Sequence, residues 1–187
     1  VHVVGEDALR VDFAALLGGR SADLVANLPY NVATEILMRL LEPPTPFRRM
    51  VVMIQLEVAQ RLEAPPGSRT YGVLSIMAQL LADCRIAFRV PPTAFTPRPK
   101  VDSAVVVLTP RAAPPVPIAD RELFKRVVRT AFGQRRKHLA NSLRSLSPAI
   151  ATVLVDVGID PTRRPETLSL AEFAAIAERL AAMPREE

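Results

Sequence analysis

The sequence predicts an α/β sheet domain followed by a small all-α domain, and three observations carry this prediction. In residues 1–110, short apolar runs alternate with segments of helical spacing, a pattern typical of strands joined by helices. Residues 111–119 are rich in proline, which suits a stiff linker better than a helix or a central strand. From residue 120 onward every segment has helical spacing. We therefore expect domains at 1–110 and 120–187, joined by a linker at 111–119.

The first domain should contain strands and helices in alternation. Apolar runs predict strands at Val1–Val4, Leu24–Ala26, Met50–Ile54, Ile86–Val90 and Ser103–Leu108. Helical spacing predicts helices at Ala33–Leu41, Glu57–Leu62 and Val73–Leu81. Polar and apolar residues alternate strictly from Arg85 to Val90, which would put Ile86, Phe88 and Val90 on one face. This alternation indicates an antiparallel or edge strand near the end of the sheet.

The second domain should be a set of short helices. Apolar residues at near-helical spacing predict a first helix from about Leu123 to Phe132, which Gly133 ends. A second, basic helix is predicted from about Arg135 to Leu146. A third should begin with Ser147 as N-cap and Pro148 as first helical residue, and end just before Gly158. Ser169 and Glu172 form a capping-box pattern that begins a last helix, ending at about Ala182.

Composition excludes several classes of protein. The 187 residues are 49% apolar, which is enough for a packed core and excludes a disordered chain. The longest uninterrupted apolar runs are five residues, far short of the roughly 20 needed to cross a bilayer. The single cysteine, Cys84, cannot form an internal disulfide, so no oxidising compartment is needed and we expect a cytoplasmic protein.

The start of the chain and its glycines suggest a fragment. The chain begins at Val1 within an apolar stretch, and its first thirty residues lack the pattern of a signal peptide. The seven glycines form no Gly-x-Gly and no Gly-x-x-x-x-Gly-Lys. We therefore expect that the beginning of the protein is missing and that the glycine loop for any nucleotide-like cofactor lies outside this sequence.

Positive charge is concentrated in the second domain. Residues 111–187 carry 13 basic and 9 acidic side chains, a net charge of +4, whereas residues 1–110 carry a net charge of only +1. The segment from Arg121 to Arg144 contains eight basic residues and one acidic residue, Glu122. Such a run is often only a solvated face. Its density nevertheless favours binding to a polyanion such as nucleic acid.

The most informative motif is Asn27-Leu28-Pro29-Tyr30, which directly follows a predicted strand. The carboxyl end of a strand is where open α/β sheets bind ligands. The Asn27 side-chain oxygen and the Leu28 carbonyl, held by rigid Pro29, can accept the hydrogens of an exocyclic base amine and so activate its weakly nucleophilic nitrogen. Tyr30 can stack on a base taken out of its helix. The alternative is a strand-ending turn with a buried tyrosine.

With these residues in view, the chain resembles the ribosomal RNA adenine dimethyltransferases, most closely the bacterial small-subunit type. The resemblance extends along essentially the whole chain and includes two departures, an extra Glu at Glu6 and Leu56 where the family usually has Lys. The segments that carry it are Gly5–Leu9, Asn27–Val32, Met53–Ala59, Val90–Ser103, Phe132–Lys137 and Leu139–Leu143.

The resemblance implies a Rossmann-like S-adenosylmethionine-dependent methyltransferase sheet without its N-terminal strands, plus a small all-α C-terminal domain. The implied reaction transfers two methyl groups to the amino nitrogen of each of two adjacent adenines in 16S rRNA of the small ribosomal subunit, and implies a role in subunit assembly. The implied cofactor-binding residues are Asp7, Ala8 and Asn27, and the implied catalytic residues are Asn27, Leu28, Pro29, Tyr30 and Phe95. Considered alone, Asp7 also fits a turn or cap residue, and Phe95 also fits an ordinary core residue.

Basic residues near these motifs are candidates for RNA binding. Arg98 and Lys100 flank the expected base pocket, and Arg135, Arg136 and Lys137 can contact phosphates. The two histidines are too isolated for a metal site, and transfer from a sulfonium needs no metal, so we expect none. We also expect a monomer that does not bind membranes.

Two alternatives remain open at this level. One is a large-subunit rRNA adenine methyltransferase of the resistance type, which shares a similar Asn-[Ile/Leu]-Pro-Tyr motif. The other is a ribosome-assembly factor that binds the immature small subunit without methylating it. Without a cofactor glycine loop, this chain alone is expected to be inactive.

Overall fold

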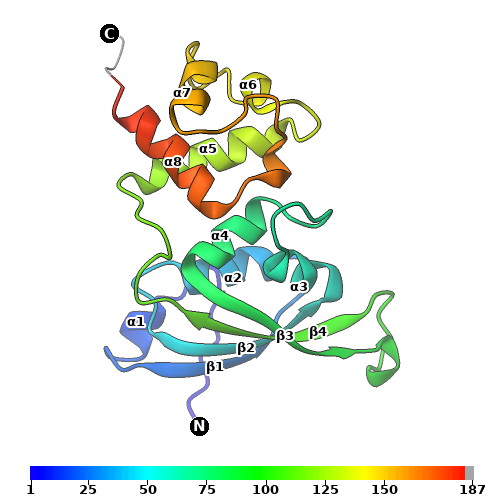
Figure 1. Cartoon of the computed structure of the whole chain (residues 1–187). Coiled ribbons are helices and arrows are strands. Elements are labelled where there is room, and N and C mark those ends of the chain that lie inside the picture. Colours follow the sequence, from blue (N-terminus) through cyan, green and yellow to red (C-terminus); the bar gives the residue numbers. More distant parts are fainter. Residues whose placement is uncertain (184–187) are drawn as a thin grey trace. The chain divides into compact units, whose positions relative to one another are not determined.

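The computed structural model describes residues 1–183, which form two compact units (Figure 1). The sheet unit comprises Val1–Glu63 and Leu81–Ala112, and the helical unit comprises Ala64–Leu80 and the chain from Ala113 onward. The helical unit therefore includes a segment, 64–80, that the sequence pattern placed in the first domain. Whether the chain folds as independent domains with boundaries at 1–110 and 120–187 stays a prediction.

The sheet unit is built on four strands in the order β1-β2-β4-β3 (Figure 1). The strands are β1 (Ala22–Asn27), β2 (Phe47–Gln55), β3 (Ala82–Val90) and β4 (Ser103–Pro110). β1 pairs with β2 in parallel, whereas β4 is antiparallel to both β2 and β3. The four corresponding predicted strands are confirmed, and so is the prediction that the run from Arg85 to Val90 forms an antiparallel strand at the end of the sheet.

The strict alternation predicted within β3 is wrong. A bulge lies between Ile86 and Phe88, so that Ile86 pairs with Val106 but Phe88 pairs with Val105. Cross-strand partners share a face, and neighbouring residues of a strand point to opposite faces. Ile86 and Phe88 therefore lie on opposite faces of the sheet, which leaves Phe88 59% exposed.

One face of the sheet is covered by helices α2 (Ala33–Leu41) and α3 (Leu56–Glu63), as Figure 1 shows. Apolar residues of α2 recur at helical spacing and are all buried, namely Ala33, Ile36, Leu37, Leu40 and Leu41. On the sheet, the residues turned toward this core are Met50, Val52, Ile54, Ala104, Val106 and Leu108, which are at most 1% exposed. The carboxyl end of β1, where the sequence motif lies, is held in the sheet by its parallel pairing with β2.

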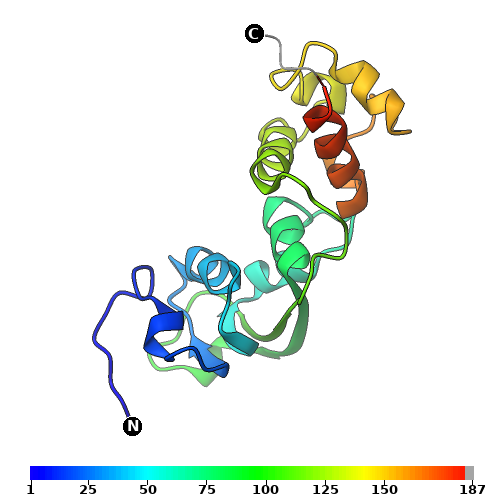
Figure 2. The same ribbon diagram turned by 90° about the vertical axis from the view of Figure 1, so that its left-hand side faces the viewer.

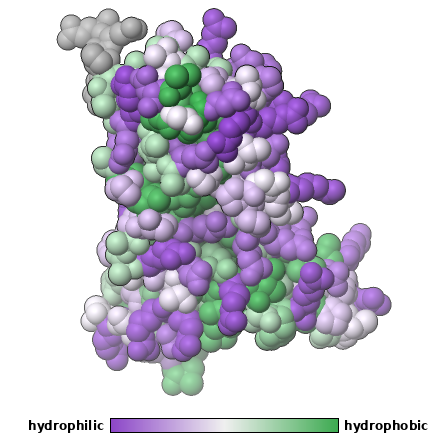
Figure 3. Space-filling view, in the orientation of Figure 1, coloured by the Kyte–Doolittle hydropathy of each residue, from purple (hydrophilic) through white to green (hydrophobic). Residues whose placement is uncertain are grey.

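The predicted strand at Val1–Val4 is not formed. The segment runs outside the sheet (Figure 2), and its apolar surface is visible below the sheet in Figure 3. Val1, Val3 and Val4 are all exposed. A strand needs a neighbour to receive its backbone hydrogen bonds, and no described strand pairs with these residues. A single-turn helix, α1 (Phe13–Leu16), follows and is N-capped by Asp12.

The helical unit packs its helices around one apolar core. Its helices are α4 (Val73–Leu81, with Leu81 itself in the sheet unit), α5 (Arg121–Gly133), α6 (Leu139–Ser142), α7 (Ile150–Asp156) and α8 (Leu170–Ala181). The ring of Phe132 lies 6.3 Å from Tyr71 and 6.0 Å from Phe173, centroid to centroid. Burial and the nearby Glu172 carboxylate raise the pKa of Tyr71 to about 12. None of the described helices is long and apolar enough to cross a membrane.

Two helix predictions in this unit are wrong in extent. The basic segment 135–146 forms only the short α6, because residues 134–138 make a turn closed by the Lys137 amide donating to the Gln134 carbonyl. Consecutive cations in a first helical turn would oppose the helix dipole. The third helix begins at Ile150 instead of Pro148, and the Ser147 side chain accepts from the Ala149 amide in the preceding turn.

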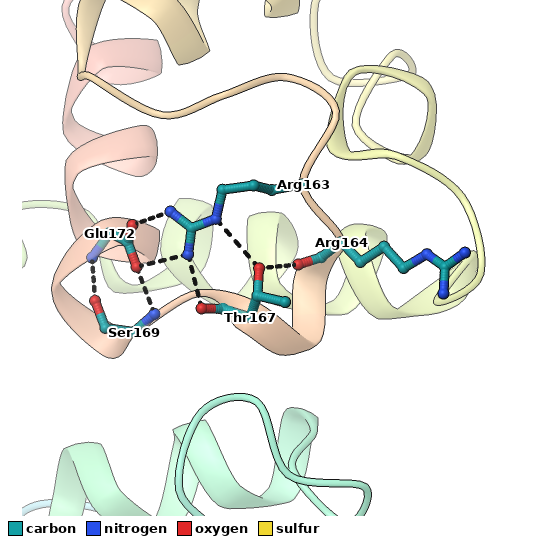
Figure 4. Close-up of polar contacts among 5 residues, drawn as sticks. All are labelled: Arg163, Arg164, Thr167, Ser169 and Glu172. Atoms are coloured by element: carbon teal, nitrogen blue, oxygen red, sulfur yellow. Dashed lines mark hydrogen bonds and ion pairs between the residues drawn. The ribbon is translucent and has the colours of Figure 1, made fainter.

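The predicted N-cap at Ser147 is wrong, because α7 begins after Ala149, but the capping predictions at Gly158 and Ser169 are confirmed. Gly158 follows α7 with a φ of 73°, a left-handed conformation that favours glycine. Ser169 and Glu172 form a capping box at the start of α8, and Arg163 donates to the Glu172 carboxylate and to Thr167 (Figure 4). Burial alone would raise the pKa of Glu172, but its hydrogen bonds with Arg163 and Ser169 hold it below its usual value.

Candidate functional site

A hollow of about 370 Å³ lies at the carboxyl end of β1. It is lined by Asn27, Leu28, Pro29, Tyr30, Phe95, Pro97 and Pro99. The structure thus brings Phe95 to the Asn27–Tyr30 motif, although they are more than 60 residues apart in the sequence. The size suits a small flat ligand such as a nucleobase, and the lining combines two aromatic side chains and three prolines with the amide of Asn27.

The polar groups of this hollow include two free acceptors, the Asn27 side-chain oxygen and the Leu28 carbonyl. Asn27 is the last residue of β1 and pairs with Met53 of β2. The next residue, Leu28, is buried, and its amide donates to the Met53 carbonyl at 3.1 Å, which holds the loop against the sheet. Among the described residues, nothing hydrogen-bonds to the Asn27 side chain or the Leu28 carbonyl. Both oxygens are therefore available to accept hydrogens from a ligand.

The Tyr30 side chain is held by a hydrogen bond to a residue that is distant in the sequence. Its hydroxyl lies 2.6 Å from the hydroxyl of Ser103, the first residue of β4. Ser103 is fully buried, and its neighbour Asp102 accepts from the Leu56 amide at 2.9 Å. The bond therefore joins the β1 loop to the end of the proline-rich loop that carries Phe95. Sequence reasoning missed Ser103, since nothing local indicates a partner 73 residues away.

Phe95 comes from that proline-rich loop. It directly follows a 3-10 turn at Pro92–Ala94, and its amide donates to the Pro92 carbonyl at 3.3 Å. Phe95 and Tyr30 are both partly exposed, and neither ring packs against another described aromatic ring. Both rings therefore have a free surface on which a base can stack.

The expected cofactor residues Asp7 and Ala8 do not line this hollow. The Asp7 carboxylate caps a turn by accepting from the Leu9 amide at 2.9 Å, and it lies 3.8 Å from the Arg10 guanidinium. Its side chain is still 56% exposed, so it can accept a further hydrogen bond. The Asp7 carboxylate and the Asn27 side-chain oxygen are each acceptors of the kind that an adenosine-type amino group needs.

The basic residues near the hollow are exposed. Arg98 and Lys100 lie on the loop between Pro97 and β4, and within the described part of the chain neither forms an ion pair. Their neighbours Pro97 and Pro99 line the hollow, but Arg98 and Lys100 do not.

The Arg135–Lys137 run is divided by the structure. Arg136 and Lys137 line a hollow of about 540 Å³ together with Gln134, His138, Asn141 and Arg144, and no acidic side chain lines it. Arg135 instead donates to the Arg69 carbonyl at 2.8 Å and lies 3.9 Å from the Glu166 carboxylate. Arg144 was recognised in the sequence only as part of the charge run, because its position depends on the turn at 134–138.

A metal site is not indicated by the described residues. Within 1–183, no three His, Cys, Asp or Glu side chains gather in a way that could hold a metal ion. Cys84 is half-buried in β3, and burial together with the Asp83 carboxylate raises the pKa of its thiol to about 12. Its thiol therefore stays protonated and poorly nucleophilic at neutral pH.

Comparison with known proteins gives a consistent result. A family model described as "Ribosomal RNA adenine dimethylase" matches residues 1–182. Ribosomal RNA small subunit methyltransferase A of Dinoroseobacter shibae is 53% identical over 185 residues, which cover 97% of this chain and 65% of the relative. The protein of the same name from Syntrophotalea carbinolica is 47% identical over 175 residues, covering 92% of this chain and 66% of the relative. The chain thus spans about two thirds of the length of these curated relatives.

Two solved structures have a similar fold. The 23S rRNA methyltransferase ErmE superposes with a TM-score of 0.69 at 24% identity, covering 95% of this chain and 71% of that one. A dimethyladenosine transferase from Plasmodium falciparum gives a TM-score of 0.71 at 22% identity, covering 91% and 69%. At these identities the likeness concerns the fold alone. The prediction of a Rossmann-like methyltransferase sheet with a helical C-terminal part is confirmed.

Proposed function

Because the chain belongs to the ribosomal RNA adenine dimethylase family, we propose that it is part of an enzyme that dimethylates the exocyclic amines of two adjacent adenines in 16S rRNA. The observation that carries this proposal is the hollow at the end of β1, where two free acceptors and two free aromatic rings converge. The relatives at 45–53% identity are all named for the small subunit, which favours this substrate over the large-subunit alternative.

The two acceptors would act on the target amine. An adenine amino group is a weak nucleophile, because its lone pair is delocalised into the ring. When the Asn27 oxygen and the Leu28 carbonyl accept its two hydrogens, the nitrogen is drawn toward tetrahedral geometry and its lone pair becomes available. Rigid Pro29 and the bond from the Leu28 amide to Met53 keep the acceptors in place, so little reorganisation is needed during the reaction.

The two rings would hold the base. An adenine can reach this hollow only after it leaves its helical stack, which costs a few kcal/mol. Stacking on Tyr30 and Phe95 returns about 1–3 kcal/mol per contact. Tyr30 is held by Ser103 and Phe95 by a proline-braced turn, so both rings are ordered before the base arrives.

The methyl donor would be S-adenosylmethionine, whose sulfonium supplies the methyl group when bound. Asp7, Ala8 and Asn27 are the residues that would hold it, with the Asp7 carboxylate accepting from the adenine amino group. The sequence has no Gly-x-Gly to cradle the rest of the cofactor. We therefore propose that this chain alone is inactive.

RNA would be held by basic residues of both units. Arg98 and Lys100 flank the base hollow, and Arg136 and Lys137 line the acid-free hollow of the helical unit. Arg135 was predicted with this group, and we propose that it mainly stabilises the fold, because it contacts the Arg69 carbonyl and the Glu166 carboxylate. We further propose a cytoplasmic monomer that contributes to small-subunit assembly, and an assembly factor without catalytic activity is the second candidate, because this chain lacks a glycine loop.

The test is methyl transfer from labelled S-adenosylmethionine by the full-length protein and by this chain. Unmethylated small subunits, unmethylated large subunits and free 16S rRNA serve as substrates. We expect four methyl groups per small subunit from the full-length protein, none on large subunits, and none from this chain. Transfer to large subunits alone would overturn the substrate assignment. Binding to small subunits without transfer by either form would favour the assembly factor.

A further inference from the structure

The helical unit contains a second large hollow, which runs along α5 and is distinct from the one lined by Arg136 and Lys137. This α5 groove has a volume of about 990 Å³ and shares no lining residue with either hollow described above. One wall is a face of α5, and the others are the turn before α7 and the end of α8. Its lining is Asp120, Glu122, Leu123, Lys125, Arg126, Arg129, Thr130, Leu146, Ser147, Pro148, Ala149, Leu180 and Met183.

The acidic groups of the α5 groove are already engaged. The Asp120 carboxylate N-caps α5 by accepting from the Leu123 amide at 2.9 Å. The Glu122 carboxylate lies 2.9 Å from the Lys125 ammonium. The Glu122 charge is therefore matched by Lys125, and the Asp120 carboxylate is directed at the first turn of α5.

Two guanidinium groups are left without a counter-ion. Arg126 and Arg129 are both exposed and lie three residues apart, which places them next to each other on one face of α5. Neither forms an ion pair or a hydrogen bond with any residue in the described range. Two adjacent guanidinium forks with no internal partner match the oxygens of a phosphodiester.

Four apolar side chains also line the α5 groove. Leu123, Leu146, Leu180 and Met183 line it and are each only partly exposed. A single-stranded nucleotide has a matching division, with a charged phosphate on one side and a ribose and base that pack against apolar or planar surfaces on the other.

We propose that the α5 groove binds the phosphodiester backbone of an unpaired RNA segment, with Arg126 and Arg129 on the phosphates. It is a second anchor on the helical unit, separate from the hollow of Arg136 and Lys137. The identification of the RNA as ribosomal rests on the proposed function. The inference that the α5 groove binds RNA rests on the charges and shape of the groove itself.

The experiment measures binding of this 187-residue chain to three probes over a range of KCl concentrations. The probes are unmethylated small subunits, protein-free 16S rRNA and a single-stranded oligouridylate. The test variant is Arg126→Gln/Arg129→Gln. The matched control is Arg121→Gln/Arg164→Gln, which removes the same charge from the helical unit outside the groove. Figure 4 shows the Arg164 guanidinium pointing away from its neighbours, and Arg121 lies on α5 but does not line the groove.

Loss of two phosphate contacts to single-stranded RNA should lower the slope of log affinity against log salt by about 1.4. We therefore expect that decrease for the test variant on all three probes, with an affinity loss of 10-fold or more at low salt, and a slope change below 0.5 for the control. Arg126→Lys/Arg129→Lys should keep most of the slope, which separates lost charge from lost fold.

Equal slopes for test and control variants on oligouridylate and 16S rRNA would overturn the proposal. A loss confined to intact small subunits would do so too, because it would assign the groove to a ribosomal protein. If the chain binds oligouridylate through these arginines but does not prefer small subunits, the proposed function is contradicted, whereas the proposal that the α5 groove binds RNA is supported.

Discussion

The hydroxyl of Tyr30 lies 2.6 Å from the hydroxyl of Ser103, and this contact joins the two loops that form the base hollow. Tyr30 belongs to the loop after β1, whereas Ser103 ends the loop that carries Phe95 and begins β4. Because Ser103 is fully buried, the phenol end of Tyr30 is anchored inside the protein while its ring remains at the hollow.

Breaking this contact should impair catalysis more than folding. Ser103→Ala and Tyr30→Phe each remove one hydrogen bond, worth about 0.5–1.5 kcal/mol, so kcat of the full-length protein should fall by about 3- to 10-fold. The double variant should lose no more than either single one, because the two hydroxyls act as one unit. Ser142→Ala, which also removes a buried hydroxyl, should leave kcat unchanged. Additive losses of kcat in the double variant would contradict the idea that the two hydroxyls act through their mutual hydrogen bond.

Removing the second ring should weaken binding of the flipped base. Phe95→Ala deletes a stacking surface worth about 1–3 kcal/mol, so kcat/KM should fall by about 5- to 150-fold. Phe88→Ala is the matched control, since Phe88 is an exposed aromatic of the same unit outside the hollow. Similar kinetics for the two variants would show that Phe95 does not touch the base.

Arg135 and Arg136 should behave differently despite being neighbours. Arg135→Ala leaves the Glu166 carboxylate without its nearby cation and the Arg69 carbonyl without its donor, so the free energy of unfolding should drop by about 1 kcal/mol. Arg136→Ala should leave stability within about 0.5 kcal/mol and lower the salt slope of RNA binding by about 0.7–0.9. Urea unfolding measures the stability of both variants, and a salt titration of RNA binding measures their salt slopes. If only Arg135→Ala lowers the salt slope, Arg135 and not Arg136 contacts the phosphates.

Acid should weaken the junction before α8. Hydrogen bonds from Arg163 and Ser169 outweigh burial and hold the pKa of Glu172 below its value in the unfolded chain, which is about 4.3. The stability from this pairing is present above pH 4.3 and is lost as pH falls through the lower folded-state pKa. Wild type should therefore exceed Glu172→Gln in unfolding free energy at pH 7, and the difference should shrink below about pH 4. A difference that is constant from pH 7 to pH 3 would contradict this.

Local signals in the sequence predicted much of the fold. The buried runs of β2 and β4 and the helical spacing of α2 depend on neighbouring residues, so they could be found without a structure. The same holds for the capping box of Ser169, which is complete within four residues. The strand predicted at Val1–Val4 was wrong because a strand forms only beside a partner strand. The alternation predicted for β3 was wrong because its bulge is set by the pairing with β4.

The site was predictable where the residues adjoin in sequence or match the family. Asn27 to Tyr30 and Phe95 were found in this way, and the structure places them around one hollow. Ser103 was missed, since its role depends on a contact across 73 residues. The separate surroundings of Arg135 and Arg136 were also missed, because a charge run in sequence does not show that one member turns toward the Arg69 carbonyl.

The central claim is that Asn27 activates the target amine. The most direct measurement is the single-turnover rate of methyl transfer to unmethylated small subunits by full-length protein carrying Asn27→Ala, with Asn31→Ala as the control from the same loop. Loss of an acceptor for a developing charge costs about 2.7–4 kcal/mol, so the rate should fall by 100- to 1000-fold while subunit binding is retained. Asn31→Ala, outside the hollow, should transfer at the wild-type rate. A wild-type rate for Asn27→Ala would contradict the assigned chemistry.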